Sequence, residues 1–385
     1  MSKNKPLQRG QTLVLFAFAI FALVGITALA IDGGNAFSDR RKAQNSADTA
    51  ALAGALAQGR GQNYQDAAIA RALDNGYDNN GTSNTVAVTH TTETIDNVTY
   101  EKIHVVITSH VPTYFGSIIG REEVTNQVEA IARYKPAVPL FGGSALVATA
   151  CSGEQTILAK GSAVVTVFGG GVYSNSSSSN SIFVQKNENL KLTSPYGGQA
   201  VGPPPCGSIP GAPVECNVTP QYPCPIPNDD PMLPKYTCDY TYVNFPPAGV
   251  TELDPGVYCV TGSFPKTNLK AIGVTIVMLN EGLQWNGGVA MHLSAPTTGP
   301  TKGIVLYLPP SNTNEIRLNG TYDLFISGTV LAPSSDIIWE GDFGSNAMHS
   351  QWIGSTLNLT GNTNGVVEYN SAENYQYQPE IELYK

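Results

Sequence analysis

Residues 10–31 read GQTLVLFAFAIFALVGITALAI, and residues 32–58 follow without a break as DGGNAFSDRRKAQNSADTAALAGALAQ. The first segment is uncharged and apolar over 22 residues. As a helix it measures about 33 Å, enough to cross the hydrocarbon core of a bilayer. We therefore predict a transmembrane helix over residues 10–31. The side chains taken as its anchor are Leu13, Phe16, Ile20, Val24 and Ile31.

The flanks of this run set its orientation. Residues 1–9 contain three Lys/Arg residues and no acidic residue, which by the positive-inside rule predicts a cytoplasmic basic tail and an extracytoplasmic remainder. A signal peptide cleaved after residues 28–30, Ala-Leu-Ala, is the alternative. Against cleavage, the apolar run is longer than a usual signal-peptide core, and Arg-Arg-Lys at 40–42 continues the helical pattern.

Composition favours a β-rich body. Charged residues make up 13% of the chain, whereas there are 39 Gly and 26 Pro, which favours strands and turns. Residues 1–42 carry a net charge of +4 against a total of −9, which leaves −13 for the remainder. This acidic remainder argues against a nucleic acid partner.

Cysteine usage agrees with an extracytoplasmic body. The number of cysteines is even, and their spacing lacks the short Cys-x-x-Cys pairs with nearby histidines that metal sites use. We expect disulfides and neither a metal nor another cofactor, with the pairing left open. The candidate residues are Cys151, Cys206, Cys216, Cys224, Cys238 and Cys259.

The segment after the apolar run predicts a small α/β module. Small residues recur every three or four positions at Ala43, Ala47, Ala51 and Gly54. This seam suits close packing against another helix or a small sheet. A second helix is expected over residues 64–75 with Gly76 as its left-handed cap. Strands are expected over 85–90, 102–110 and 124–134 because apolar residues alternate there.

Two motifs carry a resemblance to a known family. Residues 30–37 read AIDGGNAF and residues 40–55 read RRKAQNSADTAALAGA. Together with the apolar run, they resemble the N-terminal domain of the TadE/TadG-like family of Flp (Tad) pilus assembly proteins. The resemblance implies a bacterial, bitopic, pseudopilin-like module over residues 32–135. It also implies partnership with the Tad machinery, or self-assembly through the N-terminal helix.

Two family features differ here. Pilins cleaved by prepilin peptidase carry Glu five residues after the cleavage glycine, whereas the fifth residue after Gly10 is Leu15. Some TadG-like proteins carry a von Willebrand A domain with an Asp-x-Ser-x-Ser metal site, and this motif does not occur in the sequence. The C-terminal part is therefore expected to be a different domain.

Residues 136–142 read as a linker, and residues 143–385 as an all-β domain of strands three to six residues long. The repeats Gly-Thr-Val-Leu at 328 and Gly-Ser-Thr-Leu at 354 are 26 residues apart, the size of one coil of a parallel β-helix. The predicted fold class is thus α+β, with a right-handed parallel β-helix at the C-terminus. A β-sandwich or jelly roll is the alternative. Residues 197–250, rich in Pro and Cys, are expected to form a disulfide-stapled excursion that caps one end or presents a binding surface.

Enzyme signatures are sparse. Asp336, Glu340 and Asp342 are close in sequence and can share a face, but such an acidic rim is typical of solvated surface. His292 and His349 lack the spacing of paired metal ligands. Aromatic side chains suited to stacking on sugars or contacting a protein are Trp285, Trp339, Trp352, Tyr369, Tyr375, Tyr377 and Tyr384, although core packing explains them equally well.

The hypothesis from sequence is a non-catalytic, single-pass component of Tad/Flp-type pilus assembly or of cell-surface adhesion. Its N-terminus is cytoplasmic, and its acidic β-rich body faces outward toward surface glycans or proteins. One alternative is a tethered carbohydrate-active enzyme or lectin. A second is a filament-forming, pilin-like subunit, in which the anchor helices form the core.

Overall fold

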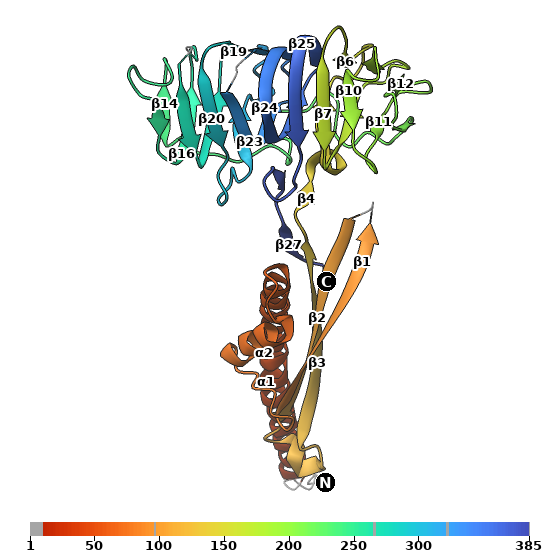
Figure 1. Ribbon diagram of the computed structural model, residues 1–385. Helices are drawn as coiled ribbons and strands as arrows, with labels where there is room; N and C mark the ends of the chain where they lie inside the picture. The colour runs from red at the N-terminus through yellow and green to blue at the C-terminus, as the bar shows by residue number, and fades with distance from the viewer. Residues whose placement is uncertain (1–10, 96–97, 265–266, 321–322, 385) are drawn as a thin grey trace, which may run out of the picture. The chain divides into compact units, whose positions relative to one another are not determined.

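The computed structural model describes residues 11–95, 98–264, 267–320 and 323–384 (Figure 1). These form two compact units. The first runs to Ala137 and includes the chain from Gln378 onward, and the second runs from Val138 to Tyr377. The expected basic tail, residues 1–9, and Gly10 lie outside the described residues.

The first unit begins with one long helix, α1 (Gln11–Gly59), whose 49 residues span about 73 Å. The helix continues through Asp32-Gly33-Gly34 without interruption. The expected second helix is confirmed as α2 (Tyr64–Asp74). The side chain of Asn63 caps its start by accepting from the backbone N–H groups of Gln65 and Asp66. Gly76 follows it with a φ of +92°.

The three expected strands form an antiparallel sheet of β1 (Asn84–Ile95), β2 (Val98–Pro112) and β3 (Glu123–Lys135). On β2 the residues Ile103, Val105 and Ile107 are buried against α1, as the alternation predicts. The turn between β2 and β3 holds a 3-10 helix, η1 (Gly116–Ile119). A fourth strand, β27 (Glu380–Leu383), pairs with β3. The segment from Gln378 onward therefore belongs to this unit, although it was predicted to be part of the all-β domain over residues 143–385.

The second unit begins and ends with β4 (Val138–Pro139) and β26 (Gln376–Tyr377), which pair antiparallel, and β4 leads into η2 (Leu140–Gly143). Its main sheet consists, among the described residues, of 21 strands. They are β5 (Ser144–Ala148), β6 (Ile157–Ala159), β7 (Val164–Phe168), β8 (Gly171–Ser174), β9 (Ile182–Val184), β10 (Leu190–Leu192), β11 (Gly198–Ala200), β12 (Gly207–Ser208), β13 (Val214–Glu215), β14 (Tyr240–Tyr242), β15 (Glu252–Leu253), β16 (Gly256–Val260), β17 (Leu269–Ile272), β18 (Val274–Met278), β19 (Leu283–Asn286), β20 (Ala290–Ser294), β21 (Ile304–Tyr307), β22 (Ile316–Asn319), β23 (Asp323–Ala332), β24 (Ile337–Gly354) and β25 (Leu357–Glu368).

These strands pair in parallel, but their order in space is not their order in sequence. From β5 the stack grows outward to β8 and then β11. The chain begins again with β14 at the other end of the stack and returns through β16, β18, β21 and β23. It closes when β24 pairs with both β23 and β5. The last strands of the unit therefore stack on its first strands.

The predicted coil offset of 26 residues is found at the start of the unit, where Leu146 pairs with Val172 and Val172 pairs with Gly198, but not at the repeat from which it was predicted. Gly328 on β23 pairs with Ser350 on β24, not with Gly354, so this step is 22 residues. The steps elsewhere vary, because Val277 pairs with Tyr307 whereas Cys259 pairs with Val277. The two Gly-x-x-Leu repeats are therefore not equivalent positions of neighbouring coils. Strands β23 to β25 are also longer than predicted, at 10, 18 and 12 residues.

Both faces of the sheet through β8, β5, β24, β23, β21, β18 and β16 are buried. One row of paired residues belongs to the main core: Val172, Leu146, Trp352, Val330, Leu306, Ile276 and Tyr258. The adjacent row, here called the outer row, belongs to a separate apolar cluster: Tyr173, Val147, Ile353, Leu331, Tyr307, Val277 and Cys259. Burial on both faces is the usual condition of parallel sheets.

The outer row is covered by residues 216–239, which we call the strap. Its buried side chains Tyr222, Ile226, Met232 and Leu233 lie in the same cluster as the outer row. The ring of Tyr236 also packs edge-on against Tyr307, with centroids 5.7 Å apart. The predicted excursion over 197–250 is therefore wrong in part, because this stretch supplies strands β11 to β14 as well as a covering segment. The strap connects the two ends of the stack.

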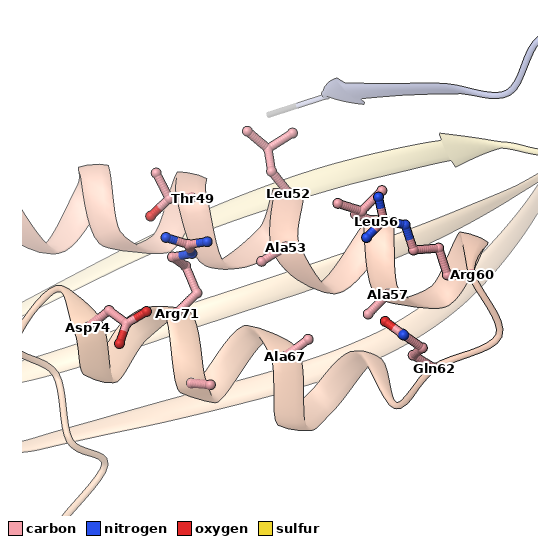
Figure 2. A pocket seen from close by; sticks show the side chains of 11 residues that line it. Thr49, Leu52, Ala53, Leu56, Ala57, Arg60, Gln62, Ala67, Arg71 and Asp74 are labelled. Atoms are coloured by element: carbon pink, nitrogen blue, oxygen red, sulfur yellow. The ribbon is translucent and has the colours of Figure 1, made fainter. Parts of the chain in front are cut away.

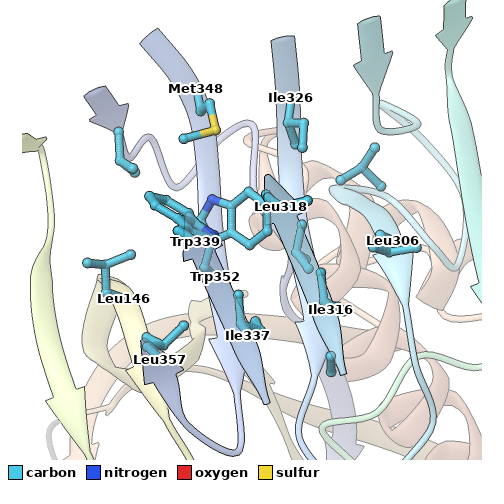
Figure 3. Packing of buried hydrophobic residues seen from close by; sticks show 14 of the residues in the cluster. Leu146, Leu306, Ile316, Leu318, Ile326, Ile337, Trp339, Met348, Trp352 and Leu357 are labelled. Carbon is cyan, nitrogen blue, oxygen red and sulfur yellow. The ribbon is translucent and has the colours of Figure 1, made fainter. Parts of the chain in front are cut away.

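The main core contains the largest aromatic residues of the unit (Figure 3). Trp285, Trp339 and Trp352 are each almost completely buried. The rings of Trp339 and Trp352 meet edge to face with centroids 4.9 Å apart, and the Trp352 indole N–H donates to the Ser350 hydroxyl at 2.8 Å. Of the two alternatives for these tryptophans, core packing is confirmed and stacking on sugars is excluded, because the core encloses them.

Candidate functional site

The apolar half of α1 is the most distinctive surface of the first unit. The expected anchor residues Leu13, Phe16, Ile20, Val24 and Ile31 are all exposed. The helix is long and apolar enough to cross a membrane, and none of its most apolar 18-residue window is buried. Such a surface is costly in water and suits hydrocarbon.

The apolar run ends at a carboxylate that binds the β2–β3 turn. One Asp32 oxygen accepts from the backbone N–H of Tyr114 at 2.8 Å, and the other accepts from Phe115 at 3.0 Å and Gly116 at 2.8 Å. Partial burial raises the pKa of Asp32, but the three N–H donors lower it more, and the net shift is downward. Asp32 thus joins the end of the apolar segment to the tip of the sheet.

The predicted seam is occupied within the chain itself. Ala43, Ala47 and Ala51 are fully buried in the core that α1 forms with the sheet and α2. A Cβ added at Gly54 would lie 2.9 Å from Ile103 Cγ2, so glycine is needed for this close approach. The seam is therefore not free for contact between copies of the chain.

A second carboxylate, which the sequence analysis missed, also fastens α1 to its own sheet. Asp39 accepts from the Ser109 hydroxyl at 2.5 Å, the Asn126 amide at 2.8 Å and the Tyr77 hydroxyl at 3.1 Å. Burial and the Asp39 charge raise the pKa of Tyr77. The only sequence signal was an acidic residue on the same helix face as the seam, since Asp39 lies four residues before Ala43.

An open groove of about 520 Å³ lies between α1 and α2 (Figure 2). The residues that line it include the apolar side chains Leu52, Leu56 and Ala67. Arg60 and Arg71 lie at its rim. The described residues that line the groove do not form a cluster of nucleophile, acid and base of the kind that catalysis requires.

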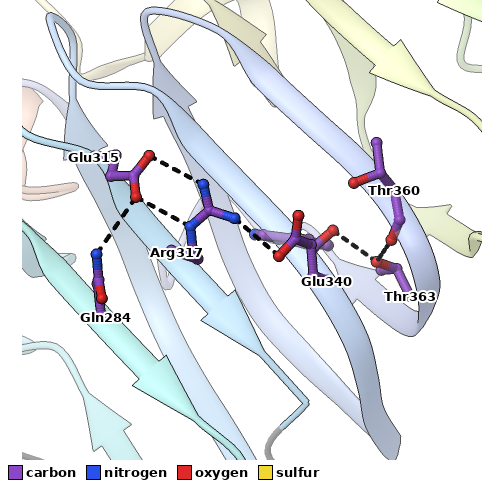
Figure 4. Close-up of polar contacts among 7 residues, drawn as sticks. Gln284, Glu315, Arg317, Glu340, Thr360 and Thr363 are labelled. Atoms are coloured by element: carbon purple, nitrogen blue, oxygen red, sulfur yellow. Dashed lines mark hydrogen bonds and ion pairs between the residues drawn. The ribbon is translucent and has the colours of Figure 1, made fainter.

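The acidic residues proposed for catalysis have structural partners. Arg317 on β22 lies between Glu315, at 3.0 Å, and Glu340 on β24, at 2.9 Å (Figure 4). The hydrogen bonds from Arg317 lower the pKa of Glu315. Asp336 instead accepts from the Thr356 hydroxyl at 2.8 Å. This arrangement is a cross-strand ion-pair network, and Glu340 and Asp336 use different partners.

The histidines are also paired with carboxylates. Each histidine lies against a carboxylate: His90 with Glu101, His104 with Glu129, His110 with Glu123, His292 with Asp323, and His349 with Glu368 and Glu373. Within the described residues, no group of three or more His, Cys, Asp or Glu side chains is placed to hold a metal ion.

The six cysteines form three disulfides, as expected from their number. Cys151 pairs with Cys224, Cys206 with Cys216, and Cys238 with Cys259. Cys216, Cys224 and Cys238 lie in the strap, while Cys259 belongs to the outer row. Each disulfide therefore joins the strap to another segment of the second unit, and Cys238–Cys259 joins it to the sheet that it covers. This pairing could not be predicted from the spacing of the cysteines.

Comparison with known proteins adds one finding for the N-terminal segment. Residues 10–58 match the family model Tad, described as putative Flp pilus-assembly TadE/G-like. Residues 10–58 carry a TadE/G-like Tad domain. The match coincides with α1 and ends before α2, and it confirms the resemblance predicted for this stretch. No similar curated protein and no similar solved structure was found for the chain.

Proposed function

We propose that this chain is a membrane-anchored, outward-facing structural component of Tad/Flp-type pilus assembly or cell-surface adhesion. The observation that carries the proposal is the exposed apolar half of α1, which lies within the Tad domain. The basic tail over residues 1–9 supports a cytoplasmic N-terminus. Three disulfides support an oxidising, extracytoplasmic location for the second unit.

We further propose that the second unit is a right-handed parallel β-helix. The parallel pairing of its successive runs of strands supports this fold, and so do its core of inward Val, Ile and Leu residues and its glycine corners. The alternative β-sandwich is less well supported, because sandwiches are built from antiparallel sheets. In this proposal the unit acts as a rigid projecting body, and the strap is part of its outer surface.

A second candidate function is that of a filament subunit. The same exposed half of α1, from Leu13 to Ile31, suits packing against copies of itself as well as against lipid. The two candidates differ in where the mature protein is found. A fixed anchor stays in the membrane, whereas a filament subunit is released with sheared surface appendages.

The orientation is tested with single cysteines in living cells. Val243→Cys, at an exposed position of the second unit, should react with a membrane-impermeant maleimide on intact spheroplasts. The matched variant Asn4→Cys, in the expected cytoplasmic tail, should react only after lysis. The reverse pattern, with position 4 labelled first, would refute the proposed orientation.

A further inference from the structure

The turn between β2 and β3 exposes an unusual set of large apolar side chains. Ile118 and Ile119 of η1 are 80% and 82% exposed, and Tyr114 beside them is 69% exposed. Adjacent aliphatic residues this exposed at a turn are uncommon on a soluble surface, where turns favour Gly, Pro, Asn, Asp and Ser. We therefore expect a partner to cover this tip, residues 113–121.

The position of the tip is fixed by the three hydrogen bonds that its backbone donates to Asp32. Asp32 is the first residue after the apolar run, so the tip lies beside the end of the segment proposed to cross the membrane. Leu29, one helical turn before Asp32 and on the same face, is also exposed. Exposed apolar side chains are thus present on both sides of the carboxylate.

The tip is a closed, shaped turn. The Arg121 N–H donates to the Gly116 carbonyl at 2.9 Å, and the Ile118 N–H donates to the Phe115 carbonyl at 3.1 Å. A Cβ at Gly116 would lie 2.8 Å from Thr113 Oγ1 and 2.9 Å from the Arg121 carbonyl, so this position requires glycine. Gly120 has a φ of +83°, which also favours glycine. The turn therefore holds both isoleucines in place.

We propose that the tip is a second membrane contact, in which Ile118 and Ile119 enter the interfacial layer of the bilayer at the end of the α1 span. Tyr114 then lies at headgroup level, where tyrosine is enriched in membrane proteins. This inference rests on the proposed membrane anchoring of α1. A lone helix can rotate about its own axis, whereas a helix with a bound second contact presents its sheet in one orientation to the membrane surface.

The test uses the full-length chain in nanodiscs of phosphatidylcholine and phosphatidylglycerol. All six native cysteines are in disulfides, so one added cysteine provides a unique thiol for the fluorophore NBD. The variants are Ile118→Cys at the tip and Ile95→Cys at the opposite end of the same sheet. Phe21→Cys in the apolar run reports on the anchor itself. Lipids carrying a shallow or a deep spin label quench the fluorophore by contact.

The expected result is loss of NBD fluorescence at position 118 with the shallow label, loss at position 21 with the deep label, and little loss at position 95. Asp32→Ala should reduce quenching at position 118 and leave position 21 unchanged. Asp66→Ala, which removes an exposed carboxylate from α2, should change neither. These variants separate the loss of the hydrogen bonds to Asp32 from a general effect of charge removal.

Two outcomes overturn the inference while leaving the anchor intact. In the first, position 21 is quenched but position 118 is not. In the second, position 118 is unquenched and its unlabelled thiol cross-links two copies, which assigns the tip to contact with a second copy of the chain. If position 21 is also unquenched by lipid, the proposed anchor itself fails.

Discussion

Trp352 on β24 pairs with Leu146 on β5, so the last turns of the second unit stack directly on its first. The two residues lie in adjacent positions of the main core although they come from opposite ends of the unit's sequence. The stack grown from β5 through β11 therefore remains open on one side until β24 and β25 are in place. Completion of the core depends on a contact of very high sequence separation, which is typically slow to form.

Removal of Trp352 should consequently weaken the whole second unit. We expect Trp352→Ala to lower the free energy of unfolding by about 3–5 kcal/mol, since it leaves a cavity beside Trp339 and removes the partner of Leu146. Urea denaturation followed by tryptophan fluorescence measures the loss. Val243→Ala, at an exposed site of the same unit, should change stability by less than about 0.5 kcal/mol. Equal effects would refute a core role for Trp352.

The disulfides should differ in their contribution to stability. Cys151–Cys224 closes a loop with a sequence separation of 73, against 10 for Cys206–Cys216. The loop-entropy relation gives about 4 kcal/mol for the first and about 3 kcal/mol for the second. The double variant C151S/C224S should therefore lose more stability than C206S/C216S, as measured by urea midpoints. Loss of the first disulfide should also expose one end of the strap to limited proteolysis.

Two helical glycines provide a matched test of the α1 seam. Gly54→Ala places a methyl group 2.9 Å from Ile103 Cγ2 and 3.2 Å from the Tyr64 carbonyl, and overpacking of this kind costs about 1–3 kcal/mol. Gly34→Ala meets no atom within 4 Å, so it should gain up to about 1 kcal/mol of helix propensity. Thermal unfolding of the full chain in detergent should move in opposite directions for the two variants. A stabilising Gly54→Ala would contradict the close packing.

The hydrogen bonds that Asp32 accepts from the β2–β3 turn should make the free energy of unfolding depend on pH. The folded-state pKa of Asp32 is below its usual value, so this carboxyl contributes stability above its unfolded pKa of about 4. That stability is lost as the pH falls from about 4 through the folded pKa, because the unfolded chain then binds the proton more readily. In Asp32→Asn the unfolding free energy in detergent should be lower at pH 7 and should fall less steeply on acidification. If the unfolding free energies of the parent and of Asp32→Asn changed in parallel with pH, the stabilising role of these hydrogen bonds would be contradicted.

The ion-pair network around Arg317 should be structural and of small effect. Replacing Glu340 by Gln should cost at most about 1 kcal/mol, because the pair is partly exposed to solvent. In the triple variant, Asp336, Glu340 and Asp342 are replaced by the corresponding amides. It should bind polysaccharide as the parent chain does, and the viscosity of a polysaccharide solution should be the same with either protein. Depolymerisation by the parent chain that disappears in this triple variant would instead support the rival enzyme.

The elements with strong local patterns could be predicted from sequence. The alternation at Ile103, Val105 and Ile107 predicts β2, and the small residues from Ala43 to Gly54 predict a closely packed helix face. These signals are local, because a strand or helix buries one face whatever its partner is. The kind of partner, another helix or a small sheet, was also predicted, but the seam did not indicate that both belong to the same chain.

Long-range features were not accessible to the same reasoning. Trp352 pairs with Leu146, and β27 pairs with β3. In both cases the local sequence of one segment does not indicate which segment it pairs with. The strap was taken for an excursion because proline is unfavourable in central strands. Its apolar residues, such as Tyr222 and Met232, lack a strand or helix period, so their burial over the outer row left no pattern to detect.

Intact-mass analysis of the protein from its host tests the central claim of membrane anchoring most directly. Membrane and sheared-surface fractions are separated first, and each is analysed without reduction so that the three disulfides are counted in the mass. The expected result is a chain that retains residues 10–31 and is confined to the membrane fraction. A chain cleaved after Gly10 or after Ala30 and recovered in the sheared or soluble fraction would contradict it.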